Sequence, residues 1–226
     1  MDNVESSSAK AILAQETKAK KRSFGAFANA VFKRGLDILA AAFGLLLLSP
    51  VFLFLAILIK RDSRGPVFFR CARAGRNGKI IQILKFRTMH ECAESYDGPS
   101  ITARDDPRIT PSGRWLRSSK LNELPQLWNV LKGEMSLVGP RPEDPEIVAT
   151  WPAEVRLELL SVRPGITSPA SVIYRNEEES LSSETVMTDY LHKILPDKLD
   201  YSVNEEGLIE IDLKAPKKPP VPAKKK

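Results

Sequence analysis

Apolar residues run without a charged interruption from Ile38 to Ile59, in the stretch ILAAAFGLLLLSPVFLFLAILI. As one continuous helix this stretch would be roughly 33 Å long, close to the thickness of the hydrocarbon core of a bilayer. It starts too late for a cleavable signal, is too long, and lacks a small-residue cleavage site. A buried core helix is the alternative, but a chain of 226 residues could hardly enclose it on all sides. We therefore expect the segment to enter a membrane.

Ser49 and Pro50 interrupt this segment near its middle. Proline removes a helical hydrogen bond and its ring crowds the preceding turn, so a kink is expected there. The Ser49 hydroxyl can satisfy a backbone carbonyl that the break leaves free. Basic pairs flank both ends, at 33–34 and 60–61, whereas a spanning helix should carry its basic residues mainly on one side. The pattern favours a re-entrant helix that dips into one leaflet and returns, and a kinked spanning helix remains the alternative.

The pattern after the membrane segment predicts an α+β fold that is mainly helical and has one small β-hairpin. Apolar and polar residues alternate on both sides of Asn77-Gly78, and this dipeptide between apolar runs is a strong hairpin signal. Thr110 followed by Pro111 predicts the start of a short helix that extends to Arg117. A further helix is predicted over Trp151 to Leu160.

The stretch KLNELPQLWNVLKGEMSLVGPRPE predicts another helix, because its apolar residues recur at helical spacing and Gly133 is placed to end it. Asn122 is expected to cap this helix, and Glu123 to lie in its first turn, where the helix dipole favours a negative charge. Residues 137–142 are expected to form a stiff turn that holds Arg141 between two prolines. The stretch VRPGITSPASVIYR, which ends at Arg175, is expected to be extended and rich in turns.

Four segments follow from this pattern. We expect a flexible basic tail over residues 1–24 and the re-entrant membrane helix over 25–61. A folded α+β domain is expected over 62–213. Residues 214–226 contain only Lys, Pro, Ala and Val and are expected to be disordered.

The net charge of the chain favours a negatively charged binding partner. The chain carries 34 Lys and Arg against 28 Asp and Glu, a formal net charge of +6. Such an excess suits a nucleic acid, an acidic membrane or a phosphorylated substrate. Nucleic acid is disfavoured because the basic residues are not clustered with stacking aromatic residues. Cys71 and Cys92 match no metal-ligand spacing or disulfide framework, and His90 and His192 are expected at the surface.

Several basic residues surround the Asn122-Glu123 pair along the chain. Each could be an ordinary solvated surface charge. However, an arginine held between prolines suits bidentate recognition of phosphate, and a helix N-terminus offers backbone donors to the same anion. A carboxylate beside a diphosphate can hold Mg²⁺. The basic residues of this candidate set are Lys85, Arg87, Arg117, Arg141, Arg163 and Arg175, and its carboxylate is Glu123.

Three runs of the sequence resemble one known family. They are LKFRTM, LRSSKLNELPQLWNVLKGEMSLVGPRPE and VRPGIT, and they follow a basic-flanked hydrophobic segment broken by Ser-Pro. Together they are similar to the bacterial sugar transferases, the monotopic phosphoglycosyl transferases that act on polyprenyl phosphate. The resemblance covers residues 31–175. It implies a re-entrant helix with Ser49-Pro50 at its break, and a catalytic domain on the cytoplasmic face of the bacterial inner membrane.

The resemblance also implies a reaction. A carboxylate attacks the β-phosphate of a UDP-sugar, UMP leaves, and polyprenyl phosphate takes the phosphosugar from the enzyme. This is the first membrane step of exopolysaccharide or glycoconjugate assembly. Mg²⁺ would assist, with Glu123 as a ligand. Four basic residues match positions that the family places around the phosphates: Lys85, Arg117, Arg141 and Arg175.

The family's catalytic pair reads Asp-Glu with Asp as the nucleophile, whereas this chain has Asn122 and Glu123. An amide is a poor nucleophile and a weak Mg²⁺ ligand. Three explanations are open: Glu123 is the nucleophile, the chain is an inactive relative, or a substituted residue traps the substrate. A non-catalytic, membrane-tethered protein that binds a lipid phosphate or a partner is the alternative function. The sequence indicates neither the sugar nor the oligomeric state.

Overall fold

A computed structural model describes residues 28–91, 101–103, 106–175, 181 and 185–202. The chain forms two compact units, Met1–Ala40 and Ala41–Lys226. The predicted tails, 1–24 and 214–226, lie outside the described residues, and the predicted domain boundary at residues 61–62 stays a prediction. Within the described residues, helices and two small sheets form an α+β fold, as expected.

The hydrophobic segment is broken where the sequence predicts it. A helix over Ala28–Leu47 is followed by α2, Ser49–Asp62, and the two are bent by 59°. The Ser49 hydroxyl donates to the Leu46 carbonyl at 2.8 Å, and proline occupies the first turn of α2, where its missing N–H is not needed. No single described helix passes the length and hydropathy test for crossing a membrane, and this bent pair passes it only when taken together.

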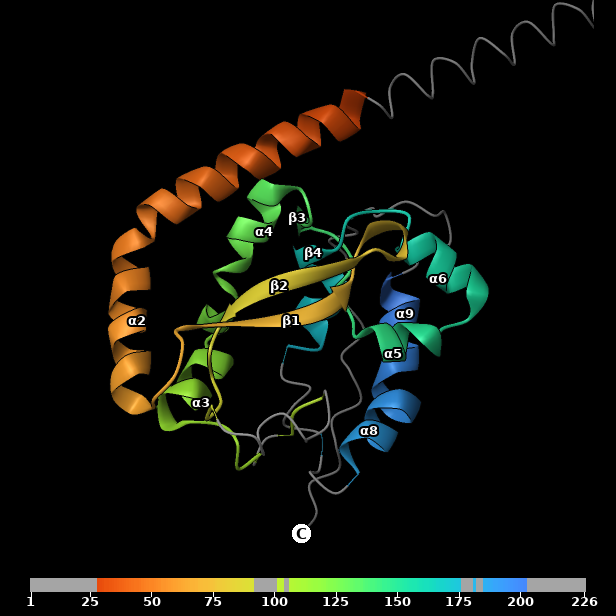
Figure 1. The fold of residues 1–226 in the computed structure, drawn as a ribbon. Helices are drawn as coiled ribbons and strands as arrows, with labels where there is room; N and C mark the ends of the chain where they lie inside the picture. Colours follow the sequence, from red (N-terminus) through yellow and green to blue (C-terminus); the bar gives the residue numbers. More distant parts are fainter. Residues whose placement is uncertain (1–27, 92–100, 104–105, 176–180, 182–184, 203–226) are drawn as a thin grey trace, which may run out of the picture. The chain divides into compact units, whose positions relative to one another are not determined.

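The predicted hairpin is confirmed and spans the second unit in Figure 1. Strands β1, Phe68–Ala74, and β2, Ile80–Phe86, pair antiparallel. They are joined by a short 3-10 turn in which Asn77 and Gly78 both have positive φ, at 58° and 73°. This left-handed pair is the conformation that an Asn-Gly hairpin adopts.

Helix α3, Pro111–Ser118, begins as predicted, because the Thr110 hydroxyl accepts a hydrogen bond from the Gly113 N–H. Its apolar face, with Leu116, packs against Leu55 of α2 and Phe86 of β2. The Asp62 carboxylate accepts from both the N–H and the hydroxyl of Ser112, at 3.0 and 2.6 Å. Helix α3 is therefore fastened to the end of α2.

The prediction that Asn122 caps a helix is wrong. Residues Leu121–Glu123 form a separate 3-10 turn, and α4, Gln126–Lys132, begins only after Pro125. Neither the turn nor α4 has a side-chain cap. Proline cannot donate to a preceding turn, so the helix restarts at this point. The predicted end at Gly133 is confirmed, with φ at 85°.

A second, parallel pair consists of β3, Ser136–Val138, and β4, Gly165–Thr167. It was not predicted from the sequence. Gly139 and Gly165 let the two segments approach so closely that a side chain at either residue would collide with backbone atoms of the other segment. The stretch that ends at Arg175 was expected to be extended, but it is only partly so. Helix α7, Pro169–Ile173, begins in it after a Ser168 cap.

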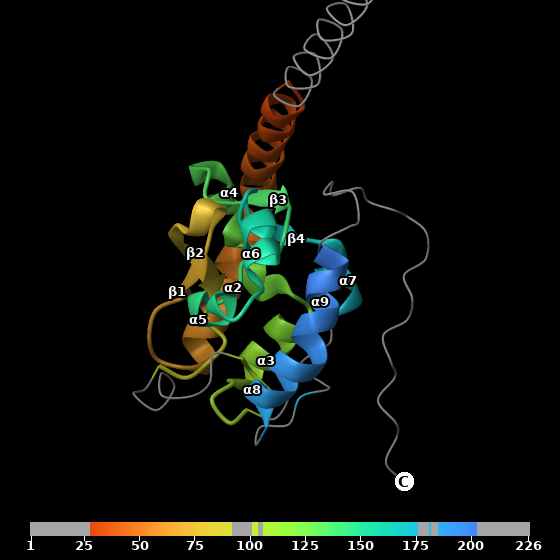
Figure 2. The same ribbon diagram turned by 90° about the vertical axis from the view of Figure 1, so that its right-hand side faces the viewer.

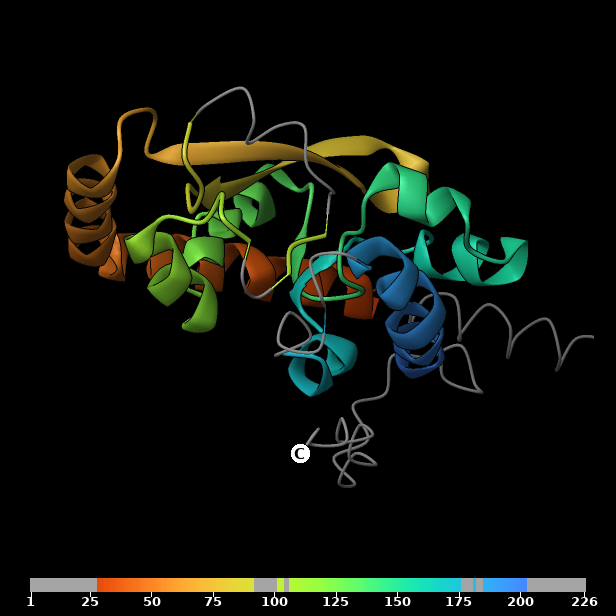
Figure 3. The same cartoon turned by 90° about the horizontal axis from the view of Figure 1, so that it is seen from below.

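The remaining helices are α5, Pro145–Ala149; α6, Ala153–Leu159; α8, Val186–Asp189; and α9, Leu195–Ser202. A π-helical turn, Tyr190–Ile194, joins α8 to α9. Helix α6 confirms the helix predicted at 151–160. One apolar cluster unites α5, α6 and the C-terminal helices through Ile147, Leu159 and Tyr190. Figure 2 shows α7 beside α9, and Figure 3 shows the hairpin on one side of the fold with α7 and α9 on the other.

Candidate functional site

The centre of the candidate site is the carboxylate of Glu123, which lies between two basic side chains. The ammonium of Lys85 donates to its Oε1 at 3.0 Å, and the Arg141 guanidinium donates to the same oxygen at 3.3 Å. These residues lie 38 and 18 positions from Glu123 along the sequence. The three side chains predicted as site residues therefore meet in space.

Strand alternation carries Lys85 to this point. Ile81 and Ile83 are buried on one face of β2, and Lys85 follows on the same face. The turn that carries Glu123 is held against that strand by a buried side chain of α4. The Asn129 amide accepts from the Leu84 N–H at 2.9 Å and donates to the Gln82 carbonyl at 2.7 Å. The Asn129 side chain thus satisfies backbone groups on the edge of β2 that a neighbouring strand would otherwise pair with, and it holds α4 against β2.

Arg141 is placed by the glycine contact between the two short parallel strands. The N–H of Gly139 donates to the Thr167 carbonyl at 3.0 Å, and the N–H of Gly165 donates to the Pro140 carbonyl at 2.8 Å. These backbone bonds and the flanking prolines restrict the turn that carries Arg141. A preorganised guanidinium loses less freedom when it binds an anion than a mobile one does.

The charges around Glu123 keep it ionised. Burial alone would raise the pKa of this carboxyl, but the positive charges of Lys85 and Arg141 outweigh that effect and hold the pKa well below its usual range. The Glu123 side chain is only 12% exposed. At neutral pH it is therefore a buried anion stabilised by two cations.

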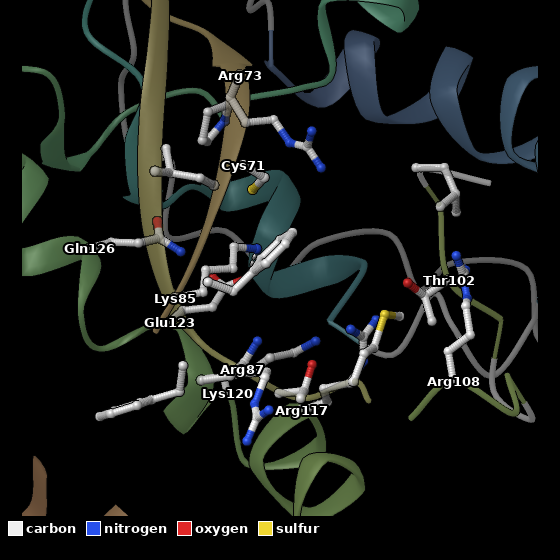
Figure 4. Close-up of a pocket in the computed structure, with 18 of the residues that line it drawn as sticks. Cys71, Arg73, Lys85, Arg87, Thr102, Arg108, Arg117, Lys120, Glu123 and Gln126 are labelled. Atoms are coloured by element: carbon white, nitrogen blue, oxygen red, sulfur yellow. Dashed lines mark hydrogen bonds and ion pairs between the residues drawn. The ribbon is translucent and has the colours of Figure 1, made fainter. Parts of the chain in front are cut away.

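A first pocket of about 390 Å³ opens over this cluster. Seven Lys and Arg residues line it against three Glu, among the residues that the structure describes. Figure 4 shows Lys85 and Glu123 side by side, with Lys120 and Arg117 nearby and Arg108 on the other wall. The excess of positive charge suits a ligand with more than one phosphate.

A second pocket of about 400 Å³ meets the first at three shared residues, Lys120, Glu123 and Arg141. Its lining differs in character from that of the first pocket. Arg175 and Lys198 add positive charge, whereas leucine, isoleucine and valine side chains line much of the rest. Glu123 is therefore accessible from two pockets, one polar and one amphiphilic.

Asn122 lines the first pocket and is 7% exposed. Its side-chain oxygen is buried and has no hydrogen-bond partner among the described residues. Such an oxygen is costly to leave unpaired, and native structures rarely leave one without a reason. The residue is thus neither a helix cap nor a satisfied core amide, and it lies where the site is built.

The remaining residues singled out from the sequence lie in the linings of the two pockets, at the helix break or on the surface. Arg117, from α3, lines the first pocket, and Arg175 lines the second. Ser49 and Pro50 are at the helix break and line neither of the two pockets. His90 and His192 are exposed, as predicted.

Sequence reasoning missed several residues of the site. Lys120 lines both pockets and has φ at 61°, a strained conformation for a residue other than glycine. Glu143 and Tyr190 line the first pocket, and Lys198 lines the second. Lys120 and Glu143 are the first and last residues of the stretch KLNELPQLWNVLKGEMSLVGPRPE, so they could have been found. Tyr190 and Lys198 come from C-terminal helices that no local signal connects to the site.

Arg87 also borders the first pocket, but its contacts are structural. Its guanidinium donates to the Ser63 carbonyl at 2.8 Å, to the Ile59 carbonyl at 3.4 Å, and to the Arg64 carbonyl. These carbonyls lie at the C-terminal end of α2, where a positive charge favours the helix dipole. Arg87 therefore ties β2 to α2.

Within the described residues, no group of three or more His, Cys, Asp or Glu side chains could hold a metal ion. Mg²⁺ nonetheless binds commonly through one or two carboxylates together with substrate phosphates. Glu123 and the unpartnered oxygen of Asn122 supply donors of this kind. The site fits a Mg²⁺ ion that binds together with a diphosphate, and not one held by the protein alone.

Comparison with known proteins bears on this site. A profile of the family described as bacterial sugar transferase matches residues 28–195. The chain is 44% identical over 145 residues to the undecaprenyl-phosphate glucose phosphotransferase of Komagataeibacter xylinus, covering 62% of this chain and 27% of that protein. It is 39% identical over 165 residues to the UDP-glucose:undecaprenyl-phosphate glucose-1-phosphate transferase of Klebsiella pneumoniae, covering 72% and 35%.

A shorter relative is matched over most of its length. The exopolysaccharide production protein ExoY of Rhizobium meliloti is 37% identical over 173 residues, covering 70% of this chain and 76% of that protein. The chain spans only about a quarter to a third of the length of the first two relatives, 27% and 35%. The family profile nevertheless includes the hydrophobic segment, both pockets' central residues and the turn around Arg141. This chain belongs to the bacterial sugar transferase family.

Proposed function

We propose that the site of this chain is built to transfer a sugar-1-phosphate from a UDP-sugar to a polyprenyl phosphate, through a phosphosugar bound covalently to a carboxylate at position 122. The observation that carries the proposal is the Glu123 carboxylate, held between Lys85 and Arg141 where the two pockets meet. The polar pocket suits the nucleotide diphosphate donor. Relatives named for UDP-glucose and undecaprenyl phosphate support both substrate classes. The product would begin a membrane-bound glycan.

The reaction has two displacements at one phosphorus atom. A carboxylate oxygen at position 122, as the Asn122→Asp variant supplies, attacks the β-phosphorus of the UDP-sugar. The bond between that phosphorus and the bridging oxygen breaks, and UMP leaves with the bridging oxygen. A phosphate oxygen of the polyprenyl phosphate then attacks the same phosphorus, which releases the carboxylate and yields the lipid diphosphate sugar.

The basic residues have definable tasks in these steps. Lys85 and Arg141 are placed to contact the β-phosphate beside Glu123, and Arg117 and Lys120 to contact the remainder of the diphosphate. Charge-assisted pairs of this kind are stronger than neutral hydrogen bonds and can stabilise charge that develops on the transferring group. Mg²⁺ bound to the diphosphate, with Glu123 as the protein ligand, would neutralise charge on the departing UMP.

Asn122 favours a second candidate function. Its amide cannot act as a carboxylate nucleophile, yet its unpartnered oxygen and the surrounding cations leave the binding part of the site complete. A chain of this kind could bind the UDP-sugar or the lipid phosphate without transferring the sugar. We expect turnover of the native chain to be far below that of a variant with aspartate at this position.

Two assays separate the candidate functions. Binding of a UDP-sugar to the native chain in detergent, with and without Mg²⁺, tests whether the site takes the donor. UMP release in the presence of Mg²⁺ and polyprenyl phosphate tests whether it turns over. Continued UMP release, beyond one UMP per chain, that requires polyprenyl phosphate supports transfer. Binding without release by either the native chain or the Asn122→Asp variant supports the non-catalytic function.

We further propose that the bent helix pair is re-entrant and that the catalytic unit lies on the cytoplasmic face of the bacterial inner membrane. Its support is the 59° break and the exposed apolar side chains on both sides of it, such as Leu46, Leu53 and Phe54. These side chains are 75%, 64% and 60% exposed, which is costly in water and favourable in lipid. The basic flanks at both ends would then remain at one membrane surface.

The topology is testable with single cysteines. After Cys71 and Cys92 are replaced by serine, Ser8→Cys and Ser118→Cys should be protected equally from an impermeant thiol reagent in intact cells and react in inside-out vesicles. Opposite accessibility of the two positions would exclude a re-entrant helix. Pro50→Leu restores a helical hydrogen bond, so it should shift the N-terminal position toward the other side.

Replacing Arg141 with lysine should slow UMP release even though the charge is kept. Lysine offers a point charge where a planar guanidinium is held by its turn and paired with Glu123. Loss of one charge-assisted pair costs on the order of 1.5–3 kcal/mol, which corresponds to roughly a tenfold to hundredfold loss of rate. Arg156→Lys, which changes a residue that lines neither pocket, is the control. An unchanged rate in Arg141→Lys would limit Arg141 to a structural role.

A further inference from the structure

Three buried side chains form a network beside the site that the proposed reaction does not use. The Tyr190 hydroxyl donates to Oε1 of Glu143 at 3.0 Å. The Lys198 ammonium donates to the Tyr190 hydroxyl at 3.0 Å and to the same Glu143 oxygen at 3.4 Å. It also lies 4.9 Å from the centre of the Tyr190 ring. The exposed fractions of Glu143, Tyr190 and Lys198 are 9%, 1% and 5%.

The π-helical turn before α9 explains why Tyr190 and Lys198 can meet. In a regular α-helix, residues eight apart point roughly 80° away from each other around the axis. The additional residue of a π-turn removes most of that offset, and such turns are frequent at functional sites. Tyr190 begins the turn Tyr190–Ile194. The irregular turn therefore brings both side chains to the face that contacts Glu143.

Glu143 joins this network to the candidate site around Glu123. It follows Arg141 by two residues, and its backbone carbonyl accepts from the N–H of Ala74 on β1 at 3.0 Å. Its carboxylate is thus fixed by the same turn that carries Arg141. A buried ion pair must overcome the cost of removing both charges from water, so it is not in itself a source of stability. Its geometry instead fixes where the ammonium lies.

The network has members in the lining of both pockets. Glu143 and Tyr190 line the first pocket, whereas Lys198 lines the second. In the second pocket, Lys198 joins Arg175, Arg141 and Lys120, against Glu123 as the one acidic residue in its described lining. The same lining includes the apolar side chains of Leu124, Leu127, Ile166 and Val172. A pocket with cations beside an apolar wall suits an amphiphile with an anionic head.

We propose that the second pocket binds the phosphate end of the polyprenyl phosphate acceptor, and that Lys198 is a specificity-determining cation of that pocket. Tyr190 and Glu143 are positioning residues that hold Lys198 there. This inference rests on the proposed function, because it assigns a place to one of its two substrates. It makes the C-terminal helices part of the site, with the donor's diphosphate in the first pocket and the acceptor's phosphate in the second.

Binding measurements on the full chain in detergent test the proposal. The probes are farnesyl phosphate, its alcohol farnesol, inorganic phosphate and UDP. Lys198→Met should weaken farnesyl phosphate binding by tenfold or more and leave farnesol and UDP binding within twofold of the native values. Tyr190→Phe should weaken farnesyl phosphate binding by a smaller factor, because the ring and the charge remain. Inorganic phosphate should bind far more weakly than farnesyl phosphate, since it lacks the apolar part.

Two further variants keep the test decisive. Lys193→Met removes a lysine of the same helical segment whose side chain is 71% exposed and paired with Asp189. It should leave the binding of all four probes at the native values. Lys198→Met alone leaves Glu143 buried without its cation, which can destabilise the fold. The double variant Lys198→Met with Glu143→Gln removes both charges and should fold. Its farnesyl phosphate binding should weaken while its farnesol binding stays within twofold of the native value.

The outcomes are distinguishable. Equal loss of farnesol, UDP and farnesyl phosphate binding in the folded double variant would make the network structural and overturn the inference. Unchanged farnesyl phosphate binding in that variant would overturn it as well, although the proposed function would stand if the native chain still bound both substrates. If the native chain binds neither UDP nor farnesyl phosphate, the proposed function and the inference both fail.

Discussion

Replacing Asn122 with aspartate is expected to raise UMP release from a UDP-sugar on the order of a thousandfold or more, because loss of a catalytic nucleophile or of its correct chemical form typically costs that much. The side chain keeps its shape and gains a carboxylate in a pocket where seven cations face three other carboxylates. Nearby cations favour the ionised, nucleophilic form. A coupled assay that detects UMP measures the rate directly.

The matched control is Asn122→Ala, which removes the unpartnered amide but adds no nucleophile. It should release UMP no faster than the native chain. Asn122→Asp is not expected to gain or lose a helix cap, since Asn122 forms none. A thermal unfolding midpoint close to the native value would show that any rate change is chemical. Equal rates in the native chain and both variants would exclude residue 122 as the nucleophile position.

Replacing Glu123 with glutamine should lower the free energy of unfolding more than any other substitution proposed for this site. The change leaves Lys85 and Arg141 without the buried carboxylate that they share at 3.0 and 3.3 Å. Breaking a buried pair by removing one partner costs about 3–5 kcal/mol, because the remaining charge is not compensated. Denaturant unfolding of the two proteins at neutral pH measures the difference. Glu154→Gln, at an exposed carboxylate, should cost little.

The same comparison has a predicted pH dependence. The pKa of Glu123 is lowered in the folded protein from an ordinary value of 4.5, so its stabilising effect is present above about pH 4.5. As the pH falls below that value, the unfolded chain takes up a proton that the folded site resists, and the stabilisation declines. The stability difference between the native chain and Glu123→Gln should therefore be constant from neutral pH to about pH 5.5 and shrink in more acidic solution. A difference that grows in acid would contradict the ion-pair assignment.

The local parts of this fold could be predicted from the sequence. The Asn77-Gly78 hairpin and the start of α3 after Thr110-Pro111 depend on short-range backbone preferences, which the sequence displays directly. The same cap-and-proline pattern at Ser168-Pro169 begins α7, and it was overlooked because the surrounding stretch resembled an extended segment. The cap expected at Asn122 failed for a related reason. Pro125 restarts the helix three residues later and leaves a separate 3-10 turn.

The site was only partly predictable because its geometry depends on long-range contacts. Lys85, Glu123 and Arg141 were named from their types and motifs, but their meeting depends on Asn129 holding α4 to β2, a contact that no local pattern indicates. The approach of Gly139 to Gly165 is equally non-local. Tyr190 and Lys198 lie 47 and 55 residues from Glu143 in the sequence, and an irregular helical turn brings both to it. A motif therefore indicates the kind of chemistry at the site, but it does not reveal the distant residues that the fold brings into the site.

The central claim is that this site transfers a phosphosugar through a covalent bond to the residue at position 122 when that residue is a carboxylate. Intact-mass analysis of the native chain and of Asn122→Asp, each incubated with a UDP-sugar and Mg²⁺, tests it most directly. The Asn122→Asp variant should gain the mass of one sugar phosphate, and added polyprenyl phosphate should remove that mass, whereas the native chain should gain little or none. An adduct on Glu123 of the native chain, unchanged by Asn122→Asp, would contradict the assignment and make Glu123 the nucleophile.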